Sequence, residues 1–292
     1  MSGITPLPDT GLPFFAYGAL KSGEPAHCQI KNFLESPPAS ATIQGSLWVR
    51  DGLPLLKIGG ADEVQGDLLR FSPSNCARAY ETIGQFESSK HYYWQTSDVV
   101  LSSSTIRANV LAGQKLEYGR AVQIDAACWT VRDDPVFRDG LDVVRASIDL
   151  NAKVPFESAP PDRFDWQRFF HLQMSYLLLW SAIERYTALL LGSNVNPNAR
   201  VKQFGEHAVF RNAFTKSGVT RKDEVADTRD PTDTFTLDPA NAASSILYYY
   251  QVRNNLSHRG KGAYADGEIV RQSLRELKVI FDRVLVDSLE NS

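Results

Sequence analysis

Short apolar runs separated by turns fill the first 131 residues and predict β-strands, because each run is rich in β-branched or aromatic residues. The predicted strands are Pro13 to Tyr17, Ala41 to Val49, Leu53 to Ile58, Glu63 to Phe71, Tyr92 to Leu101, Thr105 to Leu111 and Arg120 to Ala126. Two helices are predicted between them, over His27 to Leu34 and over Cys76 to Phe86, where apolar residues recur at helical spacing.

Longer apolar patterns begin near residue 165 and predict three helices. Trp166 to Leu191 is apolar and contains neither Gly nor Pro, so it is expected to be a buried helix. Pro239 to His258 is the second, with Asp238 as its cap and a proline at the first helical position. Glu268 to Leu289 is the third and carries an apolar stripe at helical spacing.

Two segments between these patterns are polar and rich in turn-forming residues. Residues 132–164 contain several prolines and are expected to be a linker with one short helix. Residues 192–238 are expected to hold short helices around Val201 to Phe214 and a mobile remainder. A strand-rich first part and an all-helical second part indicate two domains, at 11–131 and 165–289.

Composition and charge narrow the class of protein without naming a partner. Of the 292 residues, 43% are hydrophobic and 22% are charged, which is typical of a globular protein. A net charge of −3 means that any nucleic-acid contact must come from a local patch. The apolar stretch Phe169 to Ile183 is too short for a bilayer, and the amino end has no secretory pattern, so a cytoplasmic location is expected.

Cysteine and histidine positions give no sign of a metal or cofactor. Three cysteines without a C-x-x-C pair favour a reducing compartment and argue against a structural zinc site. His27, His91, His171 and His207 lack ligand spacing, and neither a Walker loop nor a G-x-G-x-x-G fingerprint is present. No metal and no cofactor are expected.

The first candidate site is the sequence Tyr17-Gly18-Ala19-Leu20-Lys21-Ser22-Gly23. Glycines let the backbone approach a bound group, and successive amide N–H groups can hold a carboxylate. Taken alone, the same sequence favours a plain turn from a strand into a helix.

Further along the chain, other segments accompany this loop. They are Gly45-Ser46-Leu47-Trp48, Val64-Gln65-Gly66-Asp67-Leu68, Ile83-Gly84-Gln85-Phe86-Glu87, and then Tyr92 and Tyr93. In this order they resemble the gamma-glutamylcyclotransferase-like family, a small β-barrel fold, over about residues 13 to 115. The resemblance implies an α+β protein in which a small β-barrel precedes the helices.

The resemblance also implies roles for particular residues. Tyr17, Gly18, Ala19 and Leu20 would cradle a gamma-glutamyl group near Tyr92, and Glu87 would move protons as 5-oxoproline is released. A carboxyl group with a raised pKa in a dry pocket suits this chemistry. The alternative for Glu87 is a solvated carboxylate at a helix end.

The second candidate site lies in the sequence Tyr248 to Lys261, where apolar and aromatic residues lead into Arg253, Asn254 and His258. Asn254 and His258 lie about 40° apart on a helical face, whereas Arg253 lies ~140° from His258. Arg259 and Lys261 add local positive charge. The alternative is a polar cluster that merely completes the end of a helix.

This R-N-x-x-x-H pattern, after a long helix that contains Glu184, resembles the HEPN superfamily over about residues 165 to 289. The resemblance implies an all-α HEPN helical bundle that cuts RNA without a metal, with two copies of the motif meeting in a homodimer. Arg253 would hold the phosphate, His258 would exchange protons, Asn254 would orient either group, and Arg259 and Lys261 would bind RNA. Glu184 either orients Arg253 or belongs to a surface pair with Arg185.

Three functional classes follow from the sequence. The first is a HEPN ribonuclease, which by analogy with that superfamily would be a toxin or defence effector. It would be regulated by a barrel that binds or cyclises gamma-glutamyl compounds and by a regulatory partner still to be identified. The second is a cyclotransferase with a helical dimerisation domain. The third is a binding protein without catalytic activity.

Overall fold

The computed structural model describes residues 4–102, 104–117, 120–157, 162–192, 194–258 and 266–290. The chain divides into two compact units. Unit 1 comprises Met1–Asp134, Ala188–Asn196 and Leu289–Ser292, and unit 2 comprises Pro135–Thr187 and Pro197–Ser288. No described helix is both long enough and apolar enough to cross a membrane.

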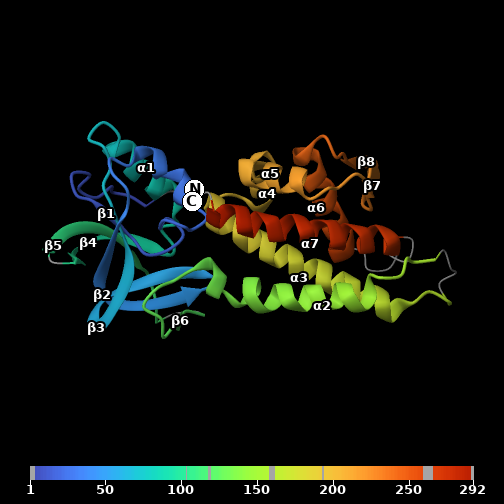
Figure 1. Ribbon diagram of the computed structural model, residues 1–292, viewed down its shortest axis with the longest axis horizontal. Helices are drawn as coiled ribbons and strands as arrows, with labels where there is room; N and C mark the ends of the chain where they lie inside the picture. The colour runs from blue at the N-terminus through green and yellow to red at the C-terminus, as the bar shows by residue number, and fades with distance from the viewer. Residues whose placement is uncertain are drawn as a thin grey trace. The chain divides into compact units, whose positions relative to one another are not determined.

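Five strands of unit 1 close into a barrel (Figure 1). They are β1 (Phe14–Ala16), β2 (Ala39–Arg50), β3 (Leu53–Leu69), β4 (Tyr92–Leu101) and β5 (Ser104–Gly113). Around the ring the order is β3, β1, β5, β4 and β2, and β2 pairs again with β3. The β1 and β5 strands are parallel and the other neighbours are antiparallel. A short strand, β6 (Val122–Gln123), pairs with β2. The predicted strand-rich first part is confirmed.

Two predicted strands, Leu53 to Ile58 and Glu63 to Phe71, form the single strand β3. The sequence break between them coincides with an irregularity: Gly45 of β2 pairs with Ile58, whereas Gln44 pairs with Glu63. Gly59 and Gly60 supply the positive φ angles, +91° and +113°, that this bulge requires. Glycine therefore marks a bulge within a strand here and not the end of one.

The helices of unit 1 agree with the sequence in one case of two. Helix α1 (Cys76–Phe86) has the predicted bounds. The predicted helix over His27 to Leu34 is instead two 3₁₀ turns, His27–Gln29 and Lys31–Phe33. Ile30, at φ −122°, interrupts them, so backbone hydrogen bonds span three residues and no α-helical turn forms.

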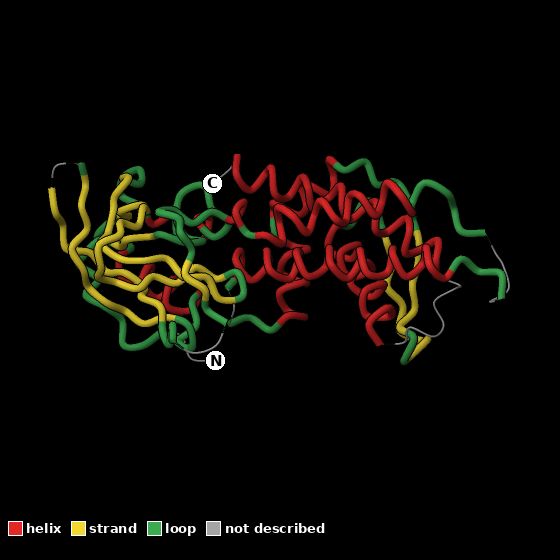
Figure 2. Tube along the Cα trace, turned by 90° about the horizontal axis from the view of Figure 1, so that it is seen from below, coloured by secondary structure: helices red, strands yellow, loops and turns green. Residues whose placement is uncertain are grey.

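Unit 2 consists of helices and one β-hairpin, which Figure 2 colours red and yellow. The helices are α2 (Leu141–Asn151), α3 (Trp166–Leu191), α4 (Pro197–Glu206), α5 (Ala208–Lys216), α6 (Ala242–His258) and α7 (Gly267–Glu290). Aromatic residues join α3 to its neighbours: the Tyr176 hydroxyl donates to Tyr249 O of α6 at 2.9 Å, and Tyr186 packs edge-on against Phe281 of α7. The predicted bounds of α3 are confirmed.

Helix α6 begins at Ala242, three residues later than predicted. The Asn241 Oδ1 atom accepts from Ser244 N at 3.1 Å and caps the helix. Asp238, the expected cap, instead accepts from Ala240 N, two residues ahead, and so forms a local turn that contains Pro239. Asp238 and Asn241 are therefore both residue types that can cap a helix, and contacts in the folded chain decide which of them does so.

The sequence had predicted an all-helical second part of the chain, and this prediction is wrong. The segment expected to be mobile forms a hairpin of β7 (Asp223–Asp227) and β8 (Asp230–Leu237). Asn255 of α6 holds it, because Nδ2 donates to Ala226 O at 2.8 Å and Oδ1 accepts from Thr228 N at 3.2 Å. The hairpin could not be predicted from its polar sequence, because a few buried contacts with α6 hold it in place.

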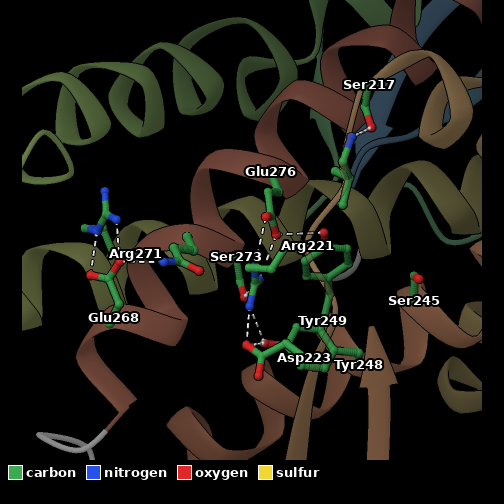
Figure 3. A network of polar contacts seen from close by, with 12 residues as sticks. Ser217, Arg221, Asp223, Ser245, Tyr248, Tyr249, Glu268, Arg271, Ser273 and Glu276 are labelled. Carbon is green, nitrogen blue, oxygen red and sulfur yellow. Dashed lines mark hydrogen bonds and ion pairs between the residues drawn. The ribbon is translucent and has the colours of Figure 1, made fainter. Parts of the chain in front are cut away.

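A network of charged and phenolic side chains ties the hairpin to α6 and α7 (Figure 3). Arg221 makes two hydrogen bonds to Glu276 of α7, at 2.9 and 2.8 Å, and an ion pair with Asp223 of β7. The hydroxyls of Tyr248 and Tyr249 donate to Asp223 and Glu276. The Arg221 and Glu276 side chains are only 19% and 20% exposed, so water stabilises their charges little and each charge is stabilised mainly by the other.

Most of residues 132–164, predicted as a linker with one short helix, lie in folded elements. A π-helical turn, Val136–Gly140, leads directly into α2. Phe137, Leu141 and Val144 are buried, and Phe137 packs against Phe281 of α7. The first boundary between the two compact units falls between Asp134 and Pro135, whereas the first domain was expected to end at residue 131.

Candidate functional site

The loop Tyr17 to Leu20 leaves the barrel at the end of β1, between β3 and β5. It turns sharply, with Lys21 N donating to Gly18 O at 2.9 Å. A Cβ atom on Gly18 would lie 2.6 Å from Pro54 Cγ, so the loop passes Pro54 at a distance that glycine permits. The amide N–H groups of Gly18, Ala19 and Leu20 make no hydrogen bond within the described part of the chain. They remain available for an anionic group.

The hydroxyl groups of Tyr17 and Tyr92 are already used by the backbone. Tyr17 Oη donates to Leu111 O at 2.7 Å and accepts from Leu56 N at 3.1 Å. Tyr92 Oη donates to Pro54 O at 2.8 Å. Both residues were predicted to bind substrate. Both line the cavity described next, where their rings form walls and their hydroxyls hold neighbouring strands.

Glu87 follows α1 directly and lines one cavity together with the loop Tyr17 to Leu20 and Tyr92. Burial raises the pKa of the Glu87 carboxyl group to about 8. Burial, and secondly the charge of Glu87, raises the pKa values of Tyr17 and Tyr92. The structure therefore brings together the predicted residues of the first site around a carboxyl group that is largely protonated at neutral pH.

This pKa makes stability depend on pH. Between the unfolded pKa of 4.5 and the folded pKa of about 8, the unfolded chain has lost the Glu87 proton while the folded chain keeps it. The folded state is therefore disfavoured as pH rises, by about 1.4 kcal/mol per unit at most. We expect Glu87→Gln to become progressively more stable than the wild type from pH 4.5 to pH 8 in urea unfolding.

Glu81→Gln is the matched control, because Glu81 lies on the exposed side of the same helix. Its stability difference from the wild type is expected to stay flat over this pH range. A flat difference for Glu87→Gln as well would mean that Glu87 titrates in the folded protein as it does in water.

Two residues that line the cavity come from a distant part of the chain, and sequence patterns did not indicate either. Ala188 and Leu189 belong to the last turn of α3 and to unit 1. They lie within an uninterrupted apolar helix, so nothing in the local sequence separates them from core residues. The sequence analysis also missed Glu24, whose pKa burial raises to about 7 and which accepts from Val131 N at 3.1 Å. Glu24 does not line this cavity.

The second predicted site lies in unit 2 and is described in part. Arg253 Nη2 lies 3.2 Å from Glu184 Oε1, so the two side chains form an ion pair between α6 and α3. Arg253 Nη1 donates to Asn254 Oδ1 at 3.3 Å. His258 is the last residue of α6, and its side chain lies outside the described residues, as do Arg259 and Lys261. Tyr248 and Tyr249 are fully buried and pack as core residues.

Among the residues that the structure describes, no three histidine, cysteine, aspartate or glutamate side chains gather closely enough to hold a metal ion.

Comparison with known proteins finds similarity in the part of the chain that holds the first site. No curated protein matches the chain. An AIG2-like protein from Mus musculus is similar in structure, with 16% identity, a TM-score of 0.31, and coverage of 37% of this chain and 80% of that chain. An uncharacterized protein from Pyrococcus horikoshii has 15% identity, a TM-score of 0.31, and coverage of 44% and 97% respectively. Residues 14–131, which hold the barrel, the loop and Glu87, match the family described as gamma-glutamyl cyclotransferase, AIG2-like.

Proposed function

We propose that unit 1 is a cyclotransferase that acts on gamma-glutamyl compounds and releases 5-oxoproline. The observation that carries this proposal is the position of Glu87, a buried carboxyl group with a raised pKa, in the same cavity as the unpaired amides of the loop Tyr17 to Leu20. The family match over residues 14–131 supports the same activity.

The reaction needs one group that takes and returns a proton. The Glu87 carboxylate removes a proton from the substrate's α-ammonium, and the free amine attacks the γ-carbonyl carbon. The bond between that carbon and the leaving amine then breaks as Glu87 returns the proton to the leaving nitrogen, and the ring nitrogen loses its second proton to water to give neutral 5-oxoproline. A pKa of about 8 suits both steps near neutral pH.

The loop amides suit the two negative charges in this reaction. The N–H groups of Gly18, Ala19 and Leu20 are donors without a protein acceptor in the described residues. They would hold the substrate's α-carboxylate or the oxyanion that forms on the γ-carbonyl. The test is 5-oxoproline release from a panel of gamma-glutamyl amines. If no compound in the panel is turned over but one binds, unit 1 is a binding module.

We propose a second function for unit 2: a homodimer cleaves RNA without a metal through Arg253, Asn254 and His258, in the manner of a HEPN toxin or defence effector. The observation that favours it is that Glu184 holds Arg253 beside Asn254 with 27% of the Arg253 side chain exposed. An arginine fixed by a carboxylate and still open to solvent can bind a phosphate.

RNA cleavage is expected in the presence of a chelator and is expected to be lost in Arg253→Ala and His258→Ala. Removing a proton-transfer group commonly lowers a rate by about 100- to 10,000-fold. The measurement is cleavage of total RNA by the purified protein, together with growth of cells that express each variant. Arg275→Ala, an exposed arginine of α7, is the control.

Equal growth and equal RNA integrity with the wild type, Arg253→Ala and Arg275→Ala would contradict the ribonuclease proposal. Unit 2 would then be better explained as a dimerisation domain. The molecular mass of the purified protein in solution shows whether it is a monomer or a dimer, and so tests that role separately.

A further inference from the structure

The cavity around Glu87 is too small for the substrate class proposed above. Its volume is about 30 Å³. That is roughly the share of one water molecule in the liquid, whereas pockets for small ligands occupy about 300–1,000 Å³. The catalytic groups are therefore assembled around a space that holds no gamma-glutamyl group.

Two side chains from the last turn of α3 reduce this space. Ala188 and Leu189 line the cavity opposite residues that come from the barrel itself. Leu189 is 2% exposed, so its side chain is committed to this packing. Residues 188–196 belong to unit 1, although they follow some 60 residues after the barrel ends.

The turn after α3 fastens these two side chains in place. Gly192 has φ +91°, and a Cβ atom there would lie 2.6 Å from Phe86 O, so the turn touches the end of α1 directly. Asn194 Nδ2 donates to Gln85 O at 3.1 Å and to Glu87 O at 2.8 Å. These carbonyls at the end of α1 have no hydrogen-bond partner within that helix. Asn194 supplies the missing donor, and so holds the backbone of Glu87, the residue that bears the catalytic carboxyl group.

We propose that Ala188 to Gly192, together with Asn194, form a removable plug in the cyclotransferase pocket. Leu189 occupies volume that the substrate needs, and Gly192 and Asn194 hold the plug against the end of α1. The pocket accepts a ligand when the last turn of α3 moves away from the loop Tyr17 to Leu20. The proposal rests on the proposed function for the identity of the ligand, but the plug itself can be tested without turnover.

Chemical labelling of Glu87 measures access to the pocket directly. A water-soluble carbodiimide activates a protonated carboxyl group, and an added amine, glycine ethyl ester, then forms an amide while the carbodiimide leaves as a urea. At neutral pH Glu87 is largely protonated, so the reaction is limited by entry of the reagent. Peptide mass spectrometry reports the labelled fraction.

We expect Leu189→Ala to raise Glu87 labelling by about tenfold or more over the full-length wild type, because the truncation removes the side chain that fills the pocket and leaves the space open to the reagent. Asn194→Ala is the second variant, and it removes the fastening without altering the core. Leu190→Ala is the matched control, since Leu190 is equally buried in the same turn but does not line the cavity. Its labelling is expected to match that of the wild type.

The outcomes separate the plug from the proposed reaction. Increased labelling in Leu189→Ala and Asn194→Ala with faster 5-oxoproline release supports both proposals. Increased labelling without any 5-oxoproline release supports the plug and rejects the cyclotransferase. Labelling that is equal in the wild type, Asn194→Ala and a folded Leu189→Ala overturns the plug, whatever the turnover.

Discussion

Replacing Glu87 with glutamine is expected to lower 5-oxoproline release by about 100- to 10,000-fold, the range commonly seen when a general acid-base group is lost. Glutamine keeps the size of the side chain and cannot accept or return the proton. The loop amides remain, so substrate binding is expected to persist. The measurement is the initial rate on the best gamma-glutamyl amine of the panel, with KM determined separately.

Glu24→Gln provides the control for this variant. Glu24 is also buried, with a pKa raised to about 7, but it lies outside the cavity. Its replacement is expected to leave the rate within a few-fold of the wild type. Turnover undiminished in Glu87→Gln would remove Glu87 from the mechanism, and an equal loss in both variants would indicate a defect in folding.

The dependence of the rate on pH follows from the same group. The first step needs the carboxylate form of Glu87. Below a pKa of about 8, the fraction of Glu87 in this form rises about tenfold for each unit by which the pH increases. The rate at low substrate concentration is therefore expected to rise with pH and to level off near pH 8.

Replacing Arg221 with leucine is expected to destabilise unit 2 by about 3–5 kcal/mol, because breaking a buried ion pair leaves its partners charged and unpaired. The two carboxylates that lose their partner are Glu276 and Asp223. The hairpin is then expected to detach from α6 and α7. Urea unfolding followed by circular dichroism gives the free energy, and hydrogen exchange locates the loss in β7 and β8.

Arg229→Leu, in the turn of the same hairpin, is the comparison. Arg229 pairs with Asp227 at 2.7 Å, but its side chain is 58% exposed, so water can replace the contact. A much smaller loss of stability is expected. Equal losses in the two variants would mean that the position of Arg221 within the network does not decide its effect.

The elements that could be predicted from the sequence are those governed by local patterns. Helices α1 and α3 and strand β4 have the predicted bounds, since their apolar residues recur at the period of a helix or a strand. The residues of the first site were also recognisable, because a glycine-containing turn after a strand and a carboxylate after a helix are short sequence features. That match to a family holds for residues 14–131.

The elements that the sequence analysis missed depend on contacts between distant residues. The hairpin β7–β8 was expected to be mobile because its residues are polar. Asn255 of α6 nevertheless holds it, and Arg221, just before β7, ties the segment to Tyr248 of α6 and Glu276 of α7. The start of α6 was misplaced because Asp238 and Asn241 are both good caps, and the turn around Pro239 decides which one acts.

The sequence by itself determined the division into a strand-rich part and a mainly helical part, the loop Tyr17 to Leu20 and the carboxyl group of Glu87. Each of these follows from neighbouring residues and their spacing. The tertiary structure alone decided the environment of that carboxyl group, because the pKa depends on burial by residues up to a hundred positions away. It also decided that Leu189 narrows the pocket, since a leucine in an apolar helix carries no local sign of what it will pack against.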